Sequence, residues 1–213
     1  MTVAAVILVR PGDDPLAGFQ GQPLVRRLVD VGWAGGAIPV IVVVPDADGA
    51  VAAALAGTSA AVVDPAPAPL GPAGHVAGGI EAALAALTAT TAAILWPARW
   101  AWVDPETITT LIEAHGRQPL ALVRPGSGGA PGWPVLLPVV GLDTVRSIAP
   151  DWSPDEVLDR LTDAGSEVLV LEVGDPGVLV DALETPAPLP FEGPPVPASG
   201  PAPAPEPDVV EDA

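Results

Sequence analysis

Lysine, cysteine and tyrosine are absent from this chain of 213 residues, and phenylalanine occurs only twice. Without cysteine there is no disulfide, no thiolate metal site and no cysteine nucleophile. With so few aromatic rings, the core must be built from Ala, Val, Leu and Ile. No apolar run reaches the roughly 18 residues of a membrane span, and the amino terminus lacks the basic stretch of a signal peptide. The sequence therefore predicts a cytoplasmic protein.

Positive charge is the scarcest property of the chain. Eight arginines face 26 acidic residues, which gives a formal net charge of −18. A chain with this charge repels other polyanions, so we expect neither nucleic acid nor an anionic membrane as a partner. It also opposes the binding of a triphosphate, unless backbone amides or a metal ion supply a positive field.

Apolar runs alternate with helix-like stretches along most of the chain. This alternation predicts an α/β fold with a mostly parallel sheet and helices on both faces. In such sheets the ligand crevice lies at the carboxyl ends of the strands. Strands are expected at Thr2–Val9, Ile38–Val44, Ala60–Val63, Ala92–Trp96, Leu120–Val123, Val135–Pro138 and Val168–Val173. Helices are expected at Pro23–Gly35, Ala50–Ala56, Ala77–Leu87 and Pro176–Leu183, and after Asp104 and Ser153.

The composition changes abruptly near the carboxyl terminus. Ten of the last 28 residues are proline, and no basic residue follows Arg160. Such a segment cannot bury enough apolar surface to offset its ordering entropy. We therefore expect one domain over residues 1–185 and a Pro-rich, acidic, disordered tail over residues 186–213.

Several short motifs occur in the order that is typical of one enzyme family. They are Gly21-Gln22-Pro23-Leu24, Val103-Asp104-Pro105-Glu106, Gly132-Trp133-Pro134-Val135 and Gly174-Asp175-Pro176-Gly177. In this order the chain resembles the MobA-like NTP transferase family, typified by molybdenum-cofactor guanylyltransferase. The resemblance implies a Rossmann-like three-layer α/β/α fold of the nucleotide-diphospho-sugar transferase type. It also implies nucleotidyl transfer from an NTP, with Mg²⁺ as the cofactor if the chain is catalytic.

The phosphate-binding loop departs from that family pattern. The corresponding segment, Arg10–Phe19, is short, carries two acids and contains no lysine. Its two prolines lack the amides that would donate to a phosphate. Only Arg10 and Gly12 remain as candidate nucleotide- or anion-binding residues in this loop.

The metal position departs as well. The metal-binding aspartate of the family falls on Arg99, and a guanidinium repels the ion that a carboxylate would hold. Asp46 and Asp48, after the second predicted strand, are candidate replacement ligands, although a solvated Pro-Asp-x-Asp-Gly turn is the commoner interpretation. The second carboxylate of the family maps onto Glu184, which completes the set of candidate metal ligands.

Two further groups could bind an anion without a metal. Three tryptophans surround Arg99 in the stretch Trp96–Trp102, where the indoles either line an anion site or fill a crevice that no longer holds nucleotide. Arg124, beside the glycine-rich loop Gly126–Gly132, either reaches an anion or lies exposed to solvent. The spacing of His75 and His115 indicates no catalytic base.

Two functions follow from these observations. The first is a divergent MobA-like protein with weakened or lost NTP transfer, which uses its fold to bind a small anionic ligand or a protein partner. The alternative is an active nucleotidyltransferase that moves a nucleotidyl group from an NTP to a cofactor or a small phosphorylated acceptor.

Overall fold

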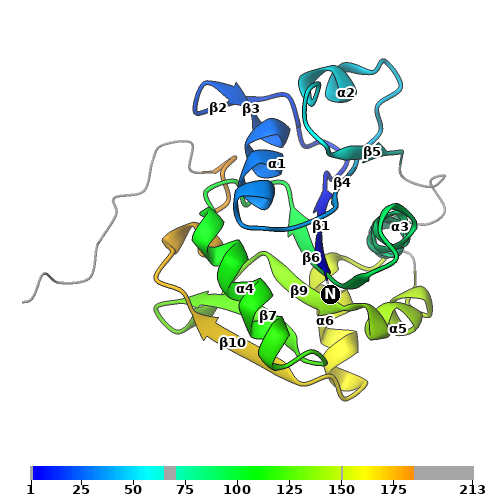
Figure 1. The fold of residues 1–213 in the computed structure, drawn as a ribbon, viewed down its shortest axis with the longest axis vertical. Helices are drawn as coiled ribbons and strands as arrows, with labels where there is room; N and C mark the ends of the chain where they lie inside the picture. The colour runs from blue at the N-terminus through cyan, green and yellow to red at the C-terminus, as the bar shows by residue number, and fades with distance from the viewer. Residues whose placement is uncertain (1, 65–70, 150, 185–213) are drawn as a thin grey trace, which may run out of the picture.

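A computed structural model describes residues 2–64, 71–149 and 151–184. An eight-stranded sheet runs through the centre in the order β10-β7-β9-β6-β1-β4-β5, with β8 paired to β7 (Figure 1). A small hairpin, β2–β3, lies apart from it. The sheet strands are β1 Thr2–Leu8, β4 Val40–Val43, β5 Ala61–Val63, β6 Thr90–Pro97, β7 Leu122–Ser127, β8 Ala130–Pro131, β9 Val135–Pro138 and β10 Val168–Glu172. The hairpin strands are β2 Gly18–Phe19 and β3 Gln22–Pro23.

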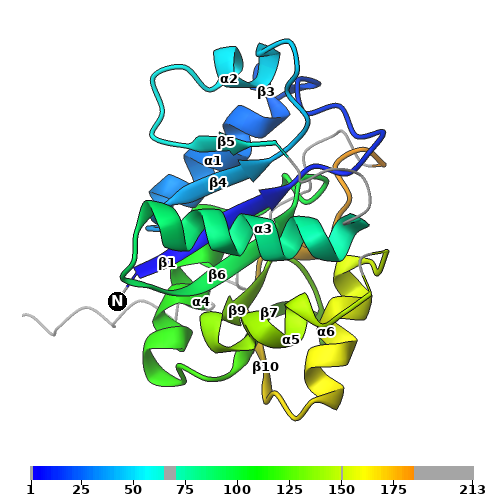
Figure 2. The same ribbon diagram turned by 90° about the vertical axis from the view of Figure 1, so that its right-hand side faces the viewer.

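Helices cover both faces of the sheet, as Figures 1 and 2 show. One face packs against α1, α2 and α4 and the other against α3, α5 and α6. The predicted three-layer α/β/α arrangement is therefore confirmed. The helices are α1 Leu24–Ala34, α2 Ala50–Ala54, α3 Gly71–Ala86, α4 Pro105–Arg117, α5 Leu142–Arg146 and α6 Pro154–Asp163, with short 3₁₀ turns at Val139–Gly141 and Pro176–Leu179.

The sequence of the central strand β1 is apolar throughout because both faces of this strand are covered. Val3, Ala5 and Ile7 enter one core, whereas Ala4 and Val6 enter the core on the opposite face. A strand covered on both sides needs apolar residues at every position rather than at every second one. β1 pairs in parallel with both β4 and β6. Their carboxyl ends therefore lie at the same edge of the sheet, where the crevice was predicted.

The sheet is mostly but not wholly parallel. β9 runs antiparallel to both β6 and β7, and β8 runs antiparallel to β7. The expected glycine-rich loop is consequently a hairpin, and Gly128 and Gly129 form its tip with φ of +59° and +82°. Positive φ at both central residues is the geometry of a tight type I′ hairpin turn.

Some boundaries differ from the sequence-based expectation. The predicted start of the helix Ala77–Leu87 was wrong, because α3 begins at Gly71 instead of Ala77. Pro72 lies in the first turn of α3, where a proline costs no helical hydrogen bond. Residues 65–70, before this helix, and the predicted tail over residues 186–213 lie outside the described residues.

Among the helices of the described ranges, none is both long enough and apolar enough to cross a bilayer.

One histidine is enclosed in the fold. His115, in the last turn of α4, is buried, and its Nε2 lies 3.0 Å from Thr91 Oγ1. Within the described residues its Nδ1 is buried without a hydrogen-bond partner. Burial lowers the pKa of His115, because the charged imidazolium is poorly solvated there.

We expect this histidine to make stability depend on pH. The unfolded chain binds a proton at His115 near pH 6.5, whereas the folded chain binds it only at lower pH. The contribution of neutral His115 to the free energy of unfolding is therefore fully present above about pH 6.5. It is lost as pH falls towards the folded pKa, with a slope of at most about 1.4 kcal/mol per pH unit. Urea unfolding at pH 7.5 and 5.5 measures this loss. His115→Gln should reduce the difference more than His75→Gln, since His75 is only partly buried; equal effects of the two variants would contradict the assignment.

Candidate functional site

The loop after β1 folds back on itself at the carboxyl end of the sheet. Pro11 and Gly12 form the corner, Gly12 has φ of +92°, and the amide of Asp13 donates to the Arg10 carbonyl over 3.0 Å. Proline followed by a glycine with positive φ is typical of a type II turn. The turn directs the Asp13 carboxylate towards Arg10, whose Nε lies 3.5 Å from Asp13 Oδ2.

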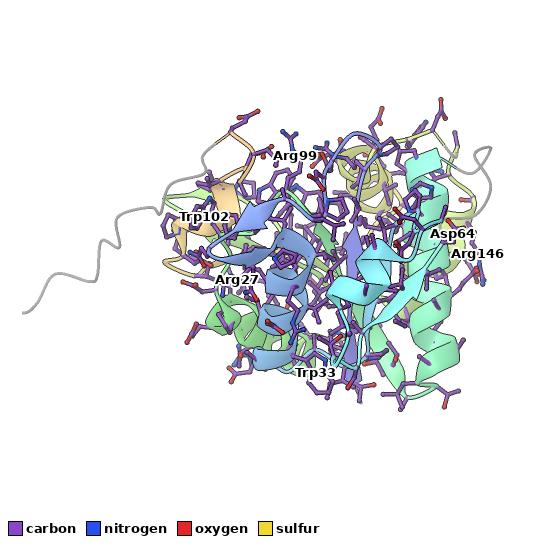
Figure 3. All side chains as sticks on the ribbon, turned by 90° about the horizontal axis from the view of Figure 1, so that it is seen from above. Arg27, Trp33, Asp64, Arg99, Trp102 and Arg146 are labelled. Atoms are coloured by element: carbon purple, nitrogen blue, oxygen red, sulfur yellow. The ribbon has the colours of Figure 1, made fainter. Side chains whose placement is uncertain are left out.

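Arg99 lies beside this loop, in the segment that follows β6 (Figure 3). Its Nε is 3.8 Å from Asp13 Oδ1, and its Nη2 is 2.9 Å from Asp181 Oδ2. Asp13 therefore bridges two guanidinium groups, and Arg99 bridges two carboxylates. We call Arg10, Asp13, Arg99 and Asp181 the crevice ion network. It joins the loop after β1, the loop after β6 and the segment after the last 3₁₀ turn.

Three backbone amides of the loop donate to acceptors within it. Besides the amide of Asp13, those of Leu16 and Ala17 donate to the Asp14 side chain and carbonyl over 2.9 and 3.2 Å. Pro11 and Pro15 have no amide hydrogen to offer. A triphosphate in this loop would therefore find few of the donors that usually cradle phosphates.

Asp46 and Asp48 lie at the start of α2. Asp46 accepts hydrogen bonds of 2.9 Å from the amides of both Val51 and Ala52, and Asp48 accepts one of 3.2 Å from Ala50. Both carboxylates thus satisfy free amides of the first helical turn. In the part of the chain that the structure describes, no three His, Cys, Asp or Glu side chains gather as a metal site.

Glu184, the third candidate metal ligand, is exposed at the end of the described chain. Its amide donates to the carbonyl of Asp181 over 3.1 Å. It is Asp181, three residues earlier, whose carboxylate contacts Arg99. The assignment of Glu184 as a metal ligand stays a prediction.

The tryptophans around Arg99 belong largely to the core. Trp96 is fully buried, and its Nε1 donates to the carbonyl of Trp100 over 2.9 Å. Trp102 packs edge-on against Phe19, with 4.5 Å between the ring centroids. Trp96 and Trp102 therefore fill the space beneath the crevice, which agrees with the structural interpretation of this stretch.

Arg124 has partners of its own on β7. Its Nε and Nη2 lie 3.5 and 3.4 Å from the carbonyl oxygen of Gly132, and its guanidinium carbon lies 5.9 Å from the ring centroid of Trp133. This arrangement is a cation–π contact. The structure thus links Arg10 and Arg99 through Asp13, whereas Arg124 contacts the segment between β8 and β9.

Two other carboxylates, those of Glu172 and Asp175, accept hydrogen bonds from backbone amides. Glu172 accepts from the amides of Gly128 and Gly129 over 2.5 and 3.3 Å. The buried Asp175 accepts from the amide of Asp104 over 3.0 Å and from the Thr107 hydroxyl over 2.7 Å. Burial, followed by the charge of Asp175, raises the pKa of Asp104.

Sequence reasoning missed the acidic members of this site. A Pro-Gly corner followed by an aspartate was a sufficient signal that Asp13 folds back towards Arg10. No comparable signal marks Asp181, because its approach to Arg99 depends on how the end of the domain packs. Asp175 was noticed only as part of a family motif.

The layers and the strand order define a three-layer α/β/α domain with a mostly parallel sheet. A family model described as the MobA-like NTP transferase domain matches residues 10–168. The chain therefore belongs to the MobA-like NTP transferase family. No protein of curated function matches the sequence.

Solved structures of related shape agree with this family. A nucleotidyl transferase from Methanothermobacter has a TM-score of 0.65 at 19% identity, and the match covers 84% of this chain and 91% of that one. Rv0371c from Mycobacterium tuberculosis, in a complex with manganese, has a TM-score of 0.64 at 18% identity over 81% and 89% of the two chains. A CMP-2-keto-3-deoxy-manno-octonic acid synthetase complexed with CTP has a TM-score of 0.64 at 13% identity over 81% and 90%. At these identities the likeness establishes the fold.

Proposed function

We propose that this MobA-like domain has lost metal-dependent nucleotidyl transfer and works in the cytoplasm as a binding protein. The observation that carries the proposal is the crevice ion network. Its two guanidinium groups are paired with carboxylates of the chain itself, at the place where the fold would receive a triphosphate.

The residues present do not fit a catalytic metal ion. By the family resemblance, Arg99 stands where a metal-binding aspartate is expected, and a divalent cation next to a guanidinium is repelled. Asp13 and Asp181 are the carboxylates nearest to Arg99, and both are already paired with it. Asp46 and Asp48 are engaged by amides of α2. A metal ion would have to displace Arg99 before Asp13 and Asp181 could serve as its ligands.

A triphosphate is disfavoured for a second reason. To reach Arg10 and Arg99 it must displace Asp13, and it brings several negative charges to a chain whose net charge is −18. The phosphate loop offers no lysine to offset them. The manganese complex and the CTP complex among the related structures support the view that this fold can hold a metal and a nucleotide. The present chain differs from that pattern in its charges.

We expect that the full chain does not bind GTP, CTP or ATP with micromolar affinity, whether Mg²⁺ or Mn²⁺ is present. Isothermal titration calorimetry measures binding, and a pyrophosphate-release assay with each NTP measures turnover. A micromolar Kd, equivalent to about 8 kcal/mol, for any metal–nucleotide pair would contradict the proposal. Together with pyrophosphate release it would establish the alternative, transfer of a nucleotidyl group to a cofactor or a small phosphorylated acceptor.

A further inference from the structure

We infer that the Asp13 carboxylate occupies a metal-free binding site for a single oxyanion group, a carboxylate or a phosphate monoester, between Arg10 and Arg99. The inference rests on the proposed function, since it assigns the crevice a ligand that is smaller than a nucleotide and needs no metal. Asp13 holds this site in the unliganded protein, and the incoming oxyanion displaces it.

The contact distances show which carboxylate would leave. Asp181 lies 2.9 Å from Arg99 Nη2, and its other oxygen accepts from the amide of Leu183 over 2.9 Å. Asp13 is held more loosely, at 3.5 Å from Arg10 and 3.8 Å from Arg99. Charge-assisted hydrogen bonds between guanidinium and carboxylate are normally 2.7–2.9 Å long. Asp181 therefore anchors Arg99, whereas Asp13 is the exchangeable partner.

Arg99 also has an unused donor on the side of Asp13. Among the described residues, its Nε is buried and makes no hydrogen bond. A buried donor without a partner is costly, and a ligand that satisfies it recovers that cost. An oxyanion at the place of Asp13 could accept from Nε of Arg99 and from the guanidinium of Arg10. Its two oxygens would then repeat the bridging arrangement that the Asp13 carboxylate makes at longer range.

The turn that carries Asp13 has room to move. The Arg10 side chain is 40% exposed, so one wall of the site faces solvent. Around Gly12, nothing lies within 4 Å of the position that a Cβ atom would occupy. The corner of the turn therefore faces open space on that side. Asp13 itself is only 9% exposed, so the space it leaves is enclosed by protein.

Charge balance limits the ligand to one oxyanion. Replacing one carboxylate by another leaves the crevice ion network neutral, and a phosphate monoester adds about one further charge. A group with more charge meets the excess of acids over bases on this chain. The rest of the ligand is therefore uncharged.

The arginine composition allows the site to be observed directly. The chain has eight arginines and no lysine, so a ¹H–¹⁵N spectrum of the arginine Nε–H groups contains few signals. Substituting Arg10 and Arg99 one at a time by lysine assigns their two signals. Inorganic phosphate and acetate are then titrated separately into the full chain at constant ionic strength, without metal or nucleotide. We expect both signals to shift saturably, while those of Arg117 and Arg160 stay in place.

Asp13→Asn removes the internal competitor and keeps the shape of the side chain. We expect this substitution to tighten binding about tenfold, because the Asp13 carboxylate then no longer competes with the ligand for the site. Asp14→Asn is the matched control: it makes the same charge change in the same loop, at an exposed residue whose carboxylate accepts from the Leu16 amide and not from Arg10 or Arg99. The Kd of this variant should remain within about twofold of the wild-type value, since a solvent-exposed charge is screened. Arg10→Gln should abolish the shift of the Arg99 signal.

The outcomes separate this inference from the proposed function. A response to phosphate alone identifies a phosphate monoester as the ligand class, and a response to acetate identifies a carboxylate; either supports the inference. The absence of a saturable Arg99 shift in both wild type and Asp13→Asn overturns it, and so does equal tightening in Asp14→Asn. These results leave the expected lack of metal–nucleotide binding untouched. That expectation fails only in the calorimetric experiment.

Discussion

Replacing Gly177 by alanine is expected to lower the free energy of unfolding by about 3 kcal/mol, at the upper end of the usual cost of overpacking. A Cβ atom at this position would lie 2.4 Å from the carbonyl oxygen of Trp102 and 2.6 Å from its carbonyl carbon. Both are backbone atoms, so the clash cannot be relieved by a rotamer change. The segment Asp175–Gly177 would have to move away from the loop after β6.

Urea unfolding of Gly177→Ala measures this cost, and Gly78→Ala is the matched control. Gly78 lies within α3, and nothing surrounds the position of its absent Cβ within 4 Å. Alanine is a better helix former than glycine, so Gly78→Ala should leave stability unchanged or raise it by up to about 1 kcal/mol. If the two variants unfold at the same urea concentration, the close approach to Trp102 is not what requires glycine at position 177.

Trp96→Ala is expected to have the largest effect of any single change, a loss of roughly 3–5 kcal/mol. Trp96 is fully buried at the end of β6, and its indole donates to the Trp100 carbonyl. The substitution leaves a cavity and an unpaired carbonyl oxygen beneath the segment that carries Arg99. The protein should therefore lose stability and, at the same time, show altered Arg99 Nε resonances.

Trp33→Ala provides the comparison for Trp96. Trp33 is 39% exposed on α1, so its removal forfeits far less buried area. Thermal unfolding of both variants, followed by circular dichroism, measures the difference. A Trp96→Ala protein as stable as Trp33→Ala would show that Trp96 does not support the crevice.

Much of the fold could be predicted because strands buried on both faces are encoded by continuous apolar runs in the sequence. The apolar run at Thr2–Val9 and the Asp104-Pro105 helix start were placed to within a residue or two. The short helix α5 and the hairpin at Gly128-Gly129 were missed. Five residues at Leu142–Arg146 are too few to show helical periodicity, and glycines that turn a hairpin look the same in a sequence as glycines in a loop.

The site was predictable only in part, for a different reason. Arg10 and Arg99 follow predicted strands, so their place at the crevice could be inferred from topology alone. Which acids these arginines contact depends on one local pair, three residues apart, and on two tertiary contacts over 82 and 86 residues of separation. Asp13 was noticed as an added negative charge, but not as the partner that closes the site. Asp46 followed a strand as well, yet the local amides of α2 engage it first.

The crevice ion network also limits the order in which this sequence can change over generations. Replacing Arg99 by aspartate alone would bring a third carboxylate to Asp13 and Asp181 and remove their shared cation. Like charges at such separation repel, so the first step towards a metal site would itself be selected against. Removing Asp13 first would leave Arg10 and Arg99 facing each other without a counterion. A carboxylate metal site at this place therefore needs coordinated substitutions on two segments that are distant in the sequence.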